Sequence, residues 1–254
     1  MTNELIKFTE EDTELLAMMG TDLDCVDVPN VEDVILPRLA IAQPLSEVLK
    51  KKNEVKFIEG AEAGCIYNTV TKEVFKGDEG MIFVPSKVII TYVEWADRNS
   101  GGGLLNNFGT DASAYLKAAK NEKGGRIGSE LGSEIIKTFN VYGYVIKDGE
   151  FTQAWIPMSK SQAKVAQKLI TLSLMLQDKA TKKTLPAFAG CYKLTTIGES
   201  NTKGDWFSFS IEYQGLTVLI PEIGVAVYQA AKNFYLNLSK DPITSAVADE
   251  DDRV

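Results

Sequence analysis

The run MIFVPSKVIITYVEWAD at residues 81–97 constrains the fold most, because β-branched and aromatic residues dominate it. This composition predicts a long β-strand. Pro85 cannot donate a hydrogen bond to a neighbouring strand, so it predicts a break or a β-bulge within the run. Residues 135–146 predict a second strand, which turns at 148–150 and returns through 151–158. The centre of the protein is therefore expected to consist of antiparallel hairpins.

Shorter segments extend this pattern on both sides. Residues 35–44 are apolar and extended, and two prolines confine them to an edge or a loop. Residues 64–69 and 73–76 predict a short hairpin, and residues 191–215 predict a long one with a polar tip. Hairpins interrupted by a few helices favour a mainly β fold with inserted helices (α+β), closed or partly open as a small barrel, over a parallel βαβ sheet.

The clearest helix signal lies at residues 160–177. Ser159 is a natural N-cap, and Gln162 three residues later completes a capping box. Weaker signals predict a helix near 9–20 and a last helix at 221–236. The expected apolar stripe of the clearest helix consists of Val165, Leu169, Leu172 and Leu176.

Charge is sorted by position along the chain, which has 27 basic and 35 acidic residues and a net charge of −8. Residues 1–34 hold ten acidic residues and one lysine, and residues 241–254 hold five acidic residues and one arginine. The central residues 35–240 therefore carry a net charge of +5. We expect an acidic N-terminal helix and arm, a nucleic-acid-binding domain with a flexible insertion at 98–133, and a disordered acidic tail.

The position of the acidic residues has two interpretations. A basic domain with an acidic tail is typical of a protein whose tail competes with a polyanion for one surface. Acidic ends that only keep the chain soluble are the alternative.

Several kinds of chemistry lack the residues that they need. The chain has no histidine, so it has no histidine general base, no Ser-His or Cys-His pair, and only half of the usual zinc ligand types. It has no GxxxxGK[ST] phosphate loop, and the acids at 249–252 on a terminal tail are not pre-organised for a metal. We therefore expect a non-enzymatic protein without cofactors. Three widely spaced cysteines predict reduced thiols in the cytoplasm, and the lack of a long apolar run predicts no membrane span.

Basic and aromatic residues recur together in the expected strands, and single-stranded nucleic acid requires this combination. Cations follow the phosphates, and ring faces stack on unpaired bases at about 1–3 kcal/mol per base. The candidate DNA-binding residues are Lys72, Tyr92, Trp95, Arg98, Lys137, Tyr142, Tyr144, Lys160, Lys164, Lys168, Lys193, Lys203 and Trp206.

Alternation along the strands separates the expected core from the expected surface. Phe209 and Ile211 share a core face, so Trp206 lies on the opposite face and is the best stacking candidate. By the same rule, Tyr142 and Tyr144 face away from the core. Most aromatic residues of a β protein belong to the core, which is the competing interpretation for each of these rings.

The lysines of the expected helix form a row. Lys160, Lys164 and Lys168 lie one turn apart, without an acidic partner four residues on. The row is either a rail for phosphates or an ordinary solvated face. The cations of the insertion at 98–133 either close over a bound strand or keep the loop soluble.

The segments LPRLAIAQPL, GCIYNTVTKEVF, FVPSKVIITYVEW, SKSQAKVAQKL and YKLTTIGESNTKGDWFSFSIE together cover about residues 35–215. In this order they resemble a group of tailed-phage single-stranded DNA-binding proteins. The resemblance implies an OB-fold-like barrel, cooperative binding without sequence preference, and an acidic C-terminal tail that recruits a polymerase or a helicase. Many such tails end in an aromatic residue, whereas this chain ends in Val254.

The sequence therefore predicts a protein that binds single-stranded DNA in phage DNA replication or recombination, in the host cytoplasm. A strand-annealing protein that forms rings or filaments is the first alternative, an acidic DNA mimic that binds a host factor is the second, and a carboxylate-metal nuclease is the third. Homo-oligomers are compatible with each of them. The residues expected to bind replication partners are Asp249, Glu250, Asp251 and Asp252.

Overall fold

The protein is seen in a computed structural model that describes residues 35–51, 55–97, 101–122, 124–202 and 204–240. The predictions made for residues 1–34 and 241–254 lie outside these ranges. In chain order the elements are β1 (Leu39–Ile41), η3 (Glu47–Leu49), β2 (Ile66–Asn68), β3 (Val74–Phe75), β4 (Met81–Trp95), β5 (Leu104–Asn107), α2 (Ser113–Lys117), β6 (Arg126–Ile127), β7 (Glu134–Lys147), β8 (Glu150–Ser159), η5 (Lys160–Gln162), α3 (Ala163–Leu174), η6 (Ala187–Ala189), β9 (Gly190–Asn201), β10 (Gly204–Leu216), η7 (Thr217–Leu219) and α4 (Gly224–Lys240).

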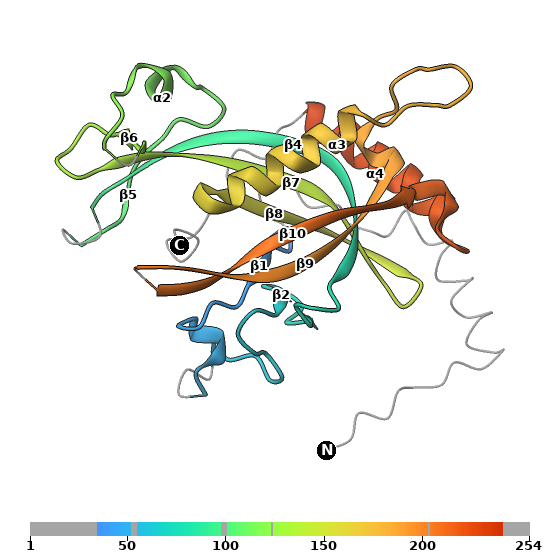
Figure 1. Cartoon of the computed structure of the whole chain (residues 1–254), viewed down its shortest axis with the longest axis horizontal. Helices are drawn as coiled ribbons and strands as arrows, with labels where there is room; N and C mark the ends of the chain where they lie inside the picture. The colour runs from blue at the N-terminus through green and yellow to red at the C-terminus, as the bar shows by residue number, and fades with distance from the viewer. Residues whose placement is uncertain (1–34, 52–54, 98–100, 123, 203, 241–254) are drawn as a thin grey trace, which may run out of the picture. The chain divides into compact units, whose positions relative to one another are not determined.

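Two antiparallel sheets dominate the structure (Figure 1). One has the order β1-β2-β3, and the larger one has the order β10-β9-β4-β7-β6, with β5 beside β4 and β8 beside β7. The predicted hairpins correspond to the pairs β2–β3, β7–β8 and β9–β10. A mainly β fold with inserted helices is therefore confirmed. Pairing among the described strands leaves the larger sheet open, so it does not close the predicted barrel.

The longest pairing joins β4 to β7. It extends from Ile82 opposite Ile146 to Trp95 opposite Glu134. The register shifts directly after Pro85, which confirms the β-bulge predicted there.

Gly143 of β7 lies opposite Pro85 at this bulge. A Cβ atom at this position would lie 2.3 Å from the carbonyl oxygen of Val84 and 2.6 Å from the Phe83 ring. Neither distance is compatible with a real side chain, so the close approach of the two strands requires glycine.

Helices cover both faces of the larger sheet. On one face, Leu169 of α3 belongs to a buried cluster with Phe139 of β7. On the other face, Phe234 of α4 belongs to a buried cluster with Tyr142 of β7. Strand β7 is consequently covered on both sides, and most residues of Glu134–Lys147 are buried.

The start of α3 differs from the prediction. The expected helix 160–177 is a 3₁₀ turn, η5, followed by the shorter α3. The predicted capping box is wrong, because neither Ser159 nor Gln162 caps the helix through its side chain. The Gln162 amide reaches β10, where its Oε1 accepts from the Phe209 N–H at 3.0 Å and its Nε2 donates to the Phe207 oxygen at 3.4 Å.

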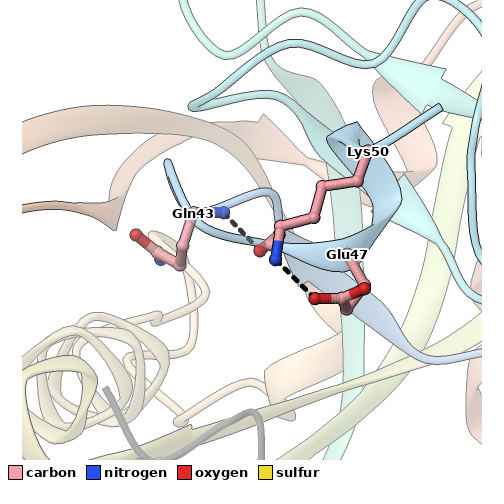
Figure 2. A network of polar contacts seen from close by, with 4 residues as sticks. Gln43, Glu47 and Lys50 are labelled. Atoms are coloured by element: carbon pink, nitrogen blue, oxygen red, sulfur yellow. Dashed lines mark hydrogen bonds and ion pairs between the residues drawn. The ribbon is translucent and has the colours of Figure 1, made fainter. Parts of the chain in front are cut away.

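Gln43 binds the same strand edge. Its Oε1 accepts from the Phe207 N–H at 2.8 Å, and its Nε2 donates to the Phe207 oxygen at 2.9 Å. Figure 2 shows what holds Gln43: its backbone N–H donates to Oγ of Ser46 at 2.9 Å, beside the Lys50–Glu47 ion pair of η3. The two glutamine amides together occupy backbone groups that an edge strand would otherwise expose.

The chain around β1 bridges the gap between β8 and β10. Arg38 forms an isolated parallel bridge with Trp155 of β8. The backbone N–H of Trp155 donates to the Pro37 oxygen at 2.9 Å. Five residues further on, Gln43 contacts β10 as described above. This connection consists of an isolated backbone bridge and of side-chain hydrogen bonds from Trp155 and Gln43, so it differs from a continuous strand ladder.

The insertion at 98–133 holds β5, α2 and β6. β5 pairs with β4 and β6 pairs with β7, at the end of these strands that lies far from α4 (Figure 1). The helix α2 of this insertion has five residues. The last helix, α4, begins three residues after Pro221 and continues to Lys240, past its expected end at 236. Among the described helices, none has the length and apolar character needed to cross a membrane.

We predict that Gln43→Ala and Gln162→Ala each lower the free energy of unfolding by about 1–2 kcal/mol, because each leaves half-buried backbone groups of β10 without hydrogen bonds. Urea unfolding measures this change. Gln167→Ala, on the exposed side of α3, is the matched control. Equal unfolding midpoints for all three variants would contradict the role given to the two amides.

Candidate nucleic-acid interface

Tyr142 and Tyr144 lie on the face of β7 opposite α3, as alternation predicts, but α4 covers them. The ring of Phe234 lies 6.1 Å from Tyr142 and 5.9 Å from Tyr144, edge-on to both. Tyr142 is 1% exposed, and burial raises its pKa to about 12. The expectation of an open ring is wrong for Tyr142, whereas Tyr144 is half-buried. Alternation gives the face of a side chain and not what covers that face.

Tyr92 and Trp95 are also buried. The ring of Tyr92 packs on Tyr115 of α2 at 5.1 Å, and Trp95 belongs to a small cluster with Val93 and Ile136. These two rings therefore stabilise the insertion at the end of β4 and β7, and they do not present a surface for stacking.

Trp206 of β10 is half-buried. It lines a hollow of about 60 Å³ together with Gln43, Ser161 and Gln162, and its Nε1 has no hydrogen-bond partner within the described part of the chain. Ligand pockets measure about 300–1,000 Å³, so a base would stack on the exposed part of the ring and not enter the hollow. The hollow also places Trp206 beside η5, the turn that begins with Lys160.

The lysine row of η5 and α3 is partly engaged. Lys160 forms an ion pair with Glu134 of β7 at 3.2 Å, and Lys168 donates to the Ile211 oxygen of β10 at 2.9 Å. Lys164 is exposed and makes no hydrogen bond or ion pair within the residues that the structure describes. The lack of acidic partners inside the helix therefore did not leave the whole row free, because the partners come from other strands.

Lys137 lies close to this row. It is next to Thr138, which pairs with Ser159 at the end of β8, directly before Lys160. Its Nζ lies 4.7 Å over the ring of Phe139. We use the name α3 surface for the set Lys137, Lys160, Lys164 and Trp206.

The remaining predicted residues do not belong to the α3 surface. Lys72 is exposed in the turn between β2 and β3, at a positive φ of 61°. Lys193 of β9 is half-buried opposite Glu212 of β10. Outside the described residues lie Arg98, Lys203, Asp249, Glu250, Asp251 and Asp252.

Among the cations of the insertion, Arg126 has a structural role. Its guanidinium lies 5.0 Å over the ring of Tyr115, and its Nη1 donates to the Ala118 oxygen at 2.7 Å. Lys117 and Lys120 are exposed on the same insertion.

Glu94 is a buried charge that the sequence analysis missed. It is 1% exposed, and its carboxylate accepts hydrogen bonds from the backbone N–H and Oγ of Ser129, from Oγ of Ser133 at 2.9 Å and from Nδ2 of Asn106 at 2.8 Å. Desolvation raises the pKa of Glu94, but the hydrogen bonds from Ser129, Asn106 and Ser133 together exceed this effect and lower the pKa from 4.5 to about 2.

This site holds the loop before β7 against β4. The donors are neutral, and they come from both sides of the insertion, so the carboxylate has the role of an anchor. The sequence contained one signal for it, which is a lone carboxylate between Val93 and Trp95 in an otherwise apolar part of β4.

Other reactive groups give no site. Within the described ranges, no group of three or more Cys, Asp or Glu side chains is arranged to hold a metal ion. Cys65 and Cys191 are buried free thiols, and burial raises the pKa of both. Cys25 lies outside the described residues.

Residues 20–244 match the family model described as Pam3 phage gp34-like protein. The chain belongs to this family. No curated protein and no solved structure matches it. The match supports the phage part of the resemblance seen in the sequence, while binding of single-stranded DNA and the OB fold stay predictions.

We predict that Glu94→Gln loosens the insertion, because the loss of one carboxylate oxygen and its charge leaves hydrogen-bond donors of the loop unpaired. Amide hydrogen exchange of residues 128–134 measures this change, with an expected acceleration of about tenfold or more. Because the folded pKa of Glu94 is depressed, its contribution to stability is present above pH 4.5 and is lost as the pH falls towards 2.

Glu130→Gln is the matched control, since it removes the same charge from an exposed side chain of the same loop. This control is expected to keep both the slow exchange and its loss in acid. If Glu94→Gln exchanged as slowly as the control, the anchoring role would be wrong.

Proposed function

We propose that this phage protein binds single-stranded DNA at the α3 surface, without sequence preference. The observation that supports the proposal is the position of Trp206 beside η5, the turn that begins with Lys160. Phosphates require cations and unpaired bases require ring faces, and this surface offers both within a few residues. The net charge of +5 of residues 35–240 favours the approach of a polyanion.

Each residue of the α3 surface has a distinct role in this proposal. Lys137 and Lys164 bind phosphates directly. Lys160 exchanges its partner, from the Glu134 carboxylate to a phosphate. Trp206 stacks on one base with the exposed part of its ring. Because Tyr142 is buried and Tyr144 is half-buried under α4, this interface is small, and we expect affinity that depends strongly on salt.

We also propose that the larger sheet functions as a partly open barrel of the OB type. The support is the bridge between β8 and β10 that Arg38 and Gln43 form, because it connects the two sides of the sheet next to Trp206.

We predict that Lys137→Gln combined with Lys164→Gln weakens the binding of a fluorescent dT oligonucleotide about tenfold at low salt. The loss of two phosphate contacts is expected to reduce the slope of log K against log salt by about 1.4, at about 0.7 per contact for a single strand. Fluorescence anisotropy over a series of salt concentrations measures both quantities.

The matched control is Lys179→Gln combined with Lys182→Gln, which changes the net charge equally at exposed positions of another loop. Equal weakening by both pairs would show attraction to net charge alone and would overturn the α3 surface. An acidic DNA mimic predicts no binding at any salt concentration. An annealing protein predicts large rings in native mass measurements, and a nuclease predicts cleavage of the oligonucleotide when Mg²⁺ is added.

We predict that deletion of residues 241–254 tightens binding of the same oligonucleotide severalfold at low salt. The deletion removes five acidic residues and one arginine, and with them an anionic competitor for the basic surface. The effect is expected to vanish at high salt, where charges are screened. Binding that is unchanged or weaker after the deletion would contradict competition by the tail.

A further inference from the structure

One side of β4 lacks a neighbouring strand over part of its length. On the side away from β7, β4 pairs with β9 at residues 81–83 and with β5 at residues 93–95. Between these two contacts, none of the described strands lies beside β4. An unpaired stretch in the middle of the sheet is therefore flanked by paired stretches at both ends.

The open stretch offers backbone hydrogen-bonding groups. The backbone groups of Tyr92 are directed to this side. Its backbone N–H donates to the Gly109 oxygen at 2.8 Å, and its carbonyl oxygen accepts from the Phe108 N–H at 3.0 Å. Backbone groups of every second residue point to the same side of a strand. The N–H and C=O groups of Val88 and Ile90 are therefore directed towards the open side.

A groove of about 510 Å³ follows this open stretch. Val88 and Ile90 line it from β4, Ile170 and Leu174 line it from α3, and Tyr235 lines it from α4. Residues 185–188 form a further part of its wall. The lining is mainly apolar, and Leu174 is 67% exposed. Helices from both faces of the sheet thus border the open edge of one strand.

A buried hydroxyl in this groove has no partner. Ser86 lines the groove and is 1% exposed, and its Oγ makes no hydrogen bond within the described part of the chain. Buried hydroxyl groups without a partner are uncommon. Together with the open backbone groups of Val88 and Ile90, it favours an extended peptide as the occupant over an apolar small molecule.

The end of α4 lies at this groove. Lys87, which lines the groove, donates through Nζ to Oγ of Ser239 at 2.8 Å and to the Leu238 oxygen at 3.2 Å. The chain therefore leaves α4 within reach of the open edge of β4. Two exposed lysines adjoin the groove wall in sequence: Lys183, two residues before Leu185, and Lys232, one turn before Tyr235 on α4.

We propose that this groove binds residues 242–252 of the same chain, along the open edge of β4. The segment follows α4 directly and combines Ile243 and Val247 with four consecutive acids at 249–252. In an extended segment, Ile243 and Val247 point to the same side, where they reach the apolar wall of α3. The acids then lie near the exposed lysines. Eleven residues span at most about 36 Å, which exceeds the length of the open stretch.

The test is amide hydrogen exchange of Val88 and Ile90 in the full-length protein, without nucleic acid. The wild type is expected to exchange slowly at both residues, and Ile243→Asp combined with Val247→Asp is expected to exchange about tenfold faster or more. The substituted residues follow α4, so the core described above is unchanged. Leu174→Glu, at an exposed position of the groove wall, is expected to have the same effect.

Thr2→Asp combined with Asn3→Asp is the matched control, because it adds the same charge outside residues 242–252. Fast exchange of Val88 and Ile90 in the wild type, or slow exchange in every variant, would overturn the proposal. Protection that increases with protein concentration would also overturn it, because the occupant would then come from a second copy. The groove and the α3 surface are alternative sites for the tail, and a tail held in the groove does not compete with DNA. The exchange test uses no DNA, so it can fail without affecting the binding of DNA proposed at the α3 surface.

Discussion

The pairing of β4 with β7 is the interaction on which the rest of the structure depends. The two strands form the centre of the larger sheet, and both helices that cover the sheet pack against them. The insertion is held at one end of the pair by Glu94, and the bulge after Pro85 bends the other end. The groove exists because β9 begins directly after η6 and accompanies β4 for only three residues.

The hairpins and the bulge could be predicted from local patterns. Composition identified β4, and the missing N–H group of Pro85 identified the bulge, because both effects act within a few residues. Alternation also gave the correct face for Tyr142 and for Phe209. Composition, proline position and alternation describe one strand and the turn that follows it, and nothing further away.

The covering of those faces could not be predicted in this way. Tyr142 has a pattern that suits an exposed ring, but Phe234, far along the chain in α4, packs against it. A helix that belongs to the opposite face of the sheet leaves no trace in the sequence of β7. For the same reason, fewer of the predicted rings are exposed than the sequence indicated.

Polar side chains were assigned to local partners, whereas the structure gives them distant ones. Gln162 has the position of a capping residue, yet its amide binds the backbone of β10. Lys160 has no acidic neighbour in its helix, yet Glu134 of β7 lies beside it. In both cases a side chain with several rotatable bonds reaches another element, and one-dimensional spacing contains no information on that contact.

Gly143 has a consequence for how the two central strands find each other. A shift of β7 by one residue would exchange its two faces, so that Phe139 would lose its cluster with α3 and Tyr142 would lose its cluster with α4. A shift by two residues would bring Val141 or Val145 to the place where the Phe83 ring already fills the space of a side chain. Gly143 opposite Pro85 therefore favours a single register of β4 and β7, and this register determines which residues of the two strands lie beside the insertion.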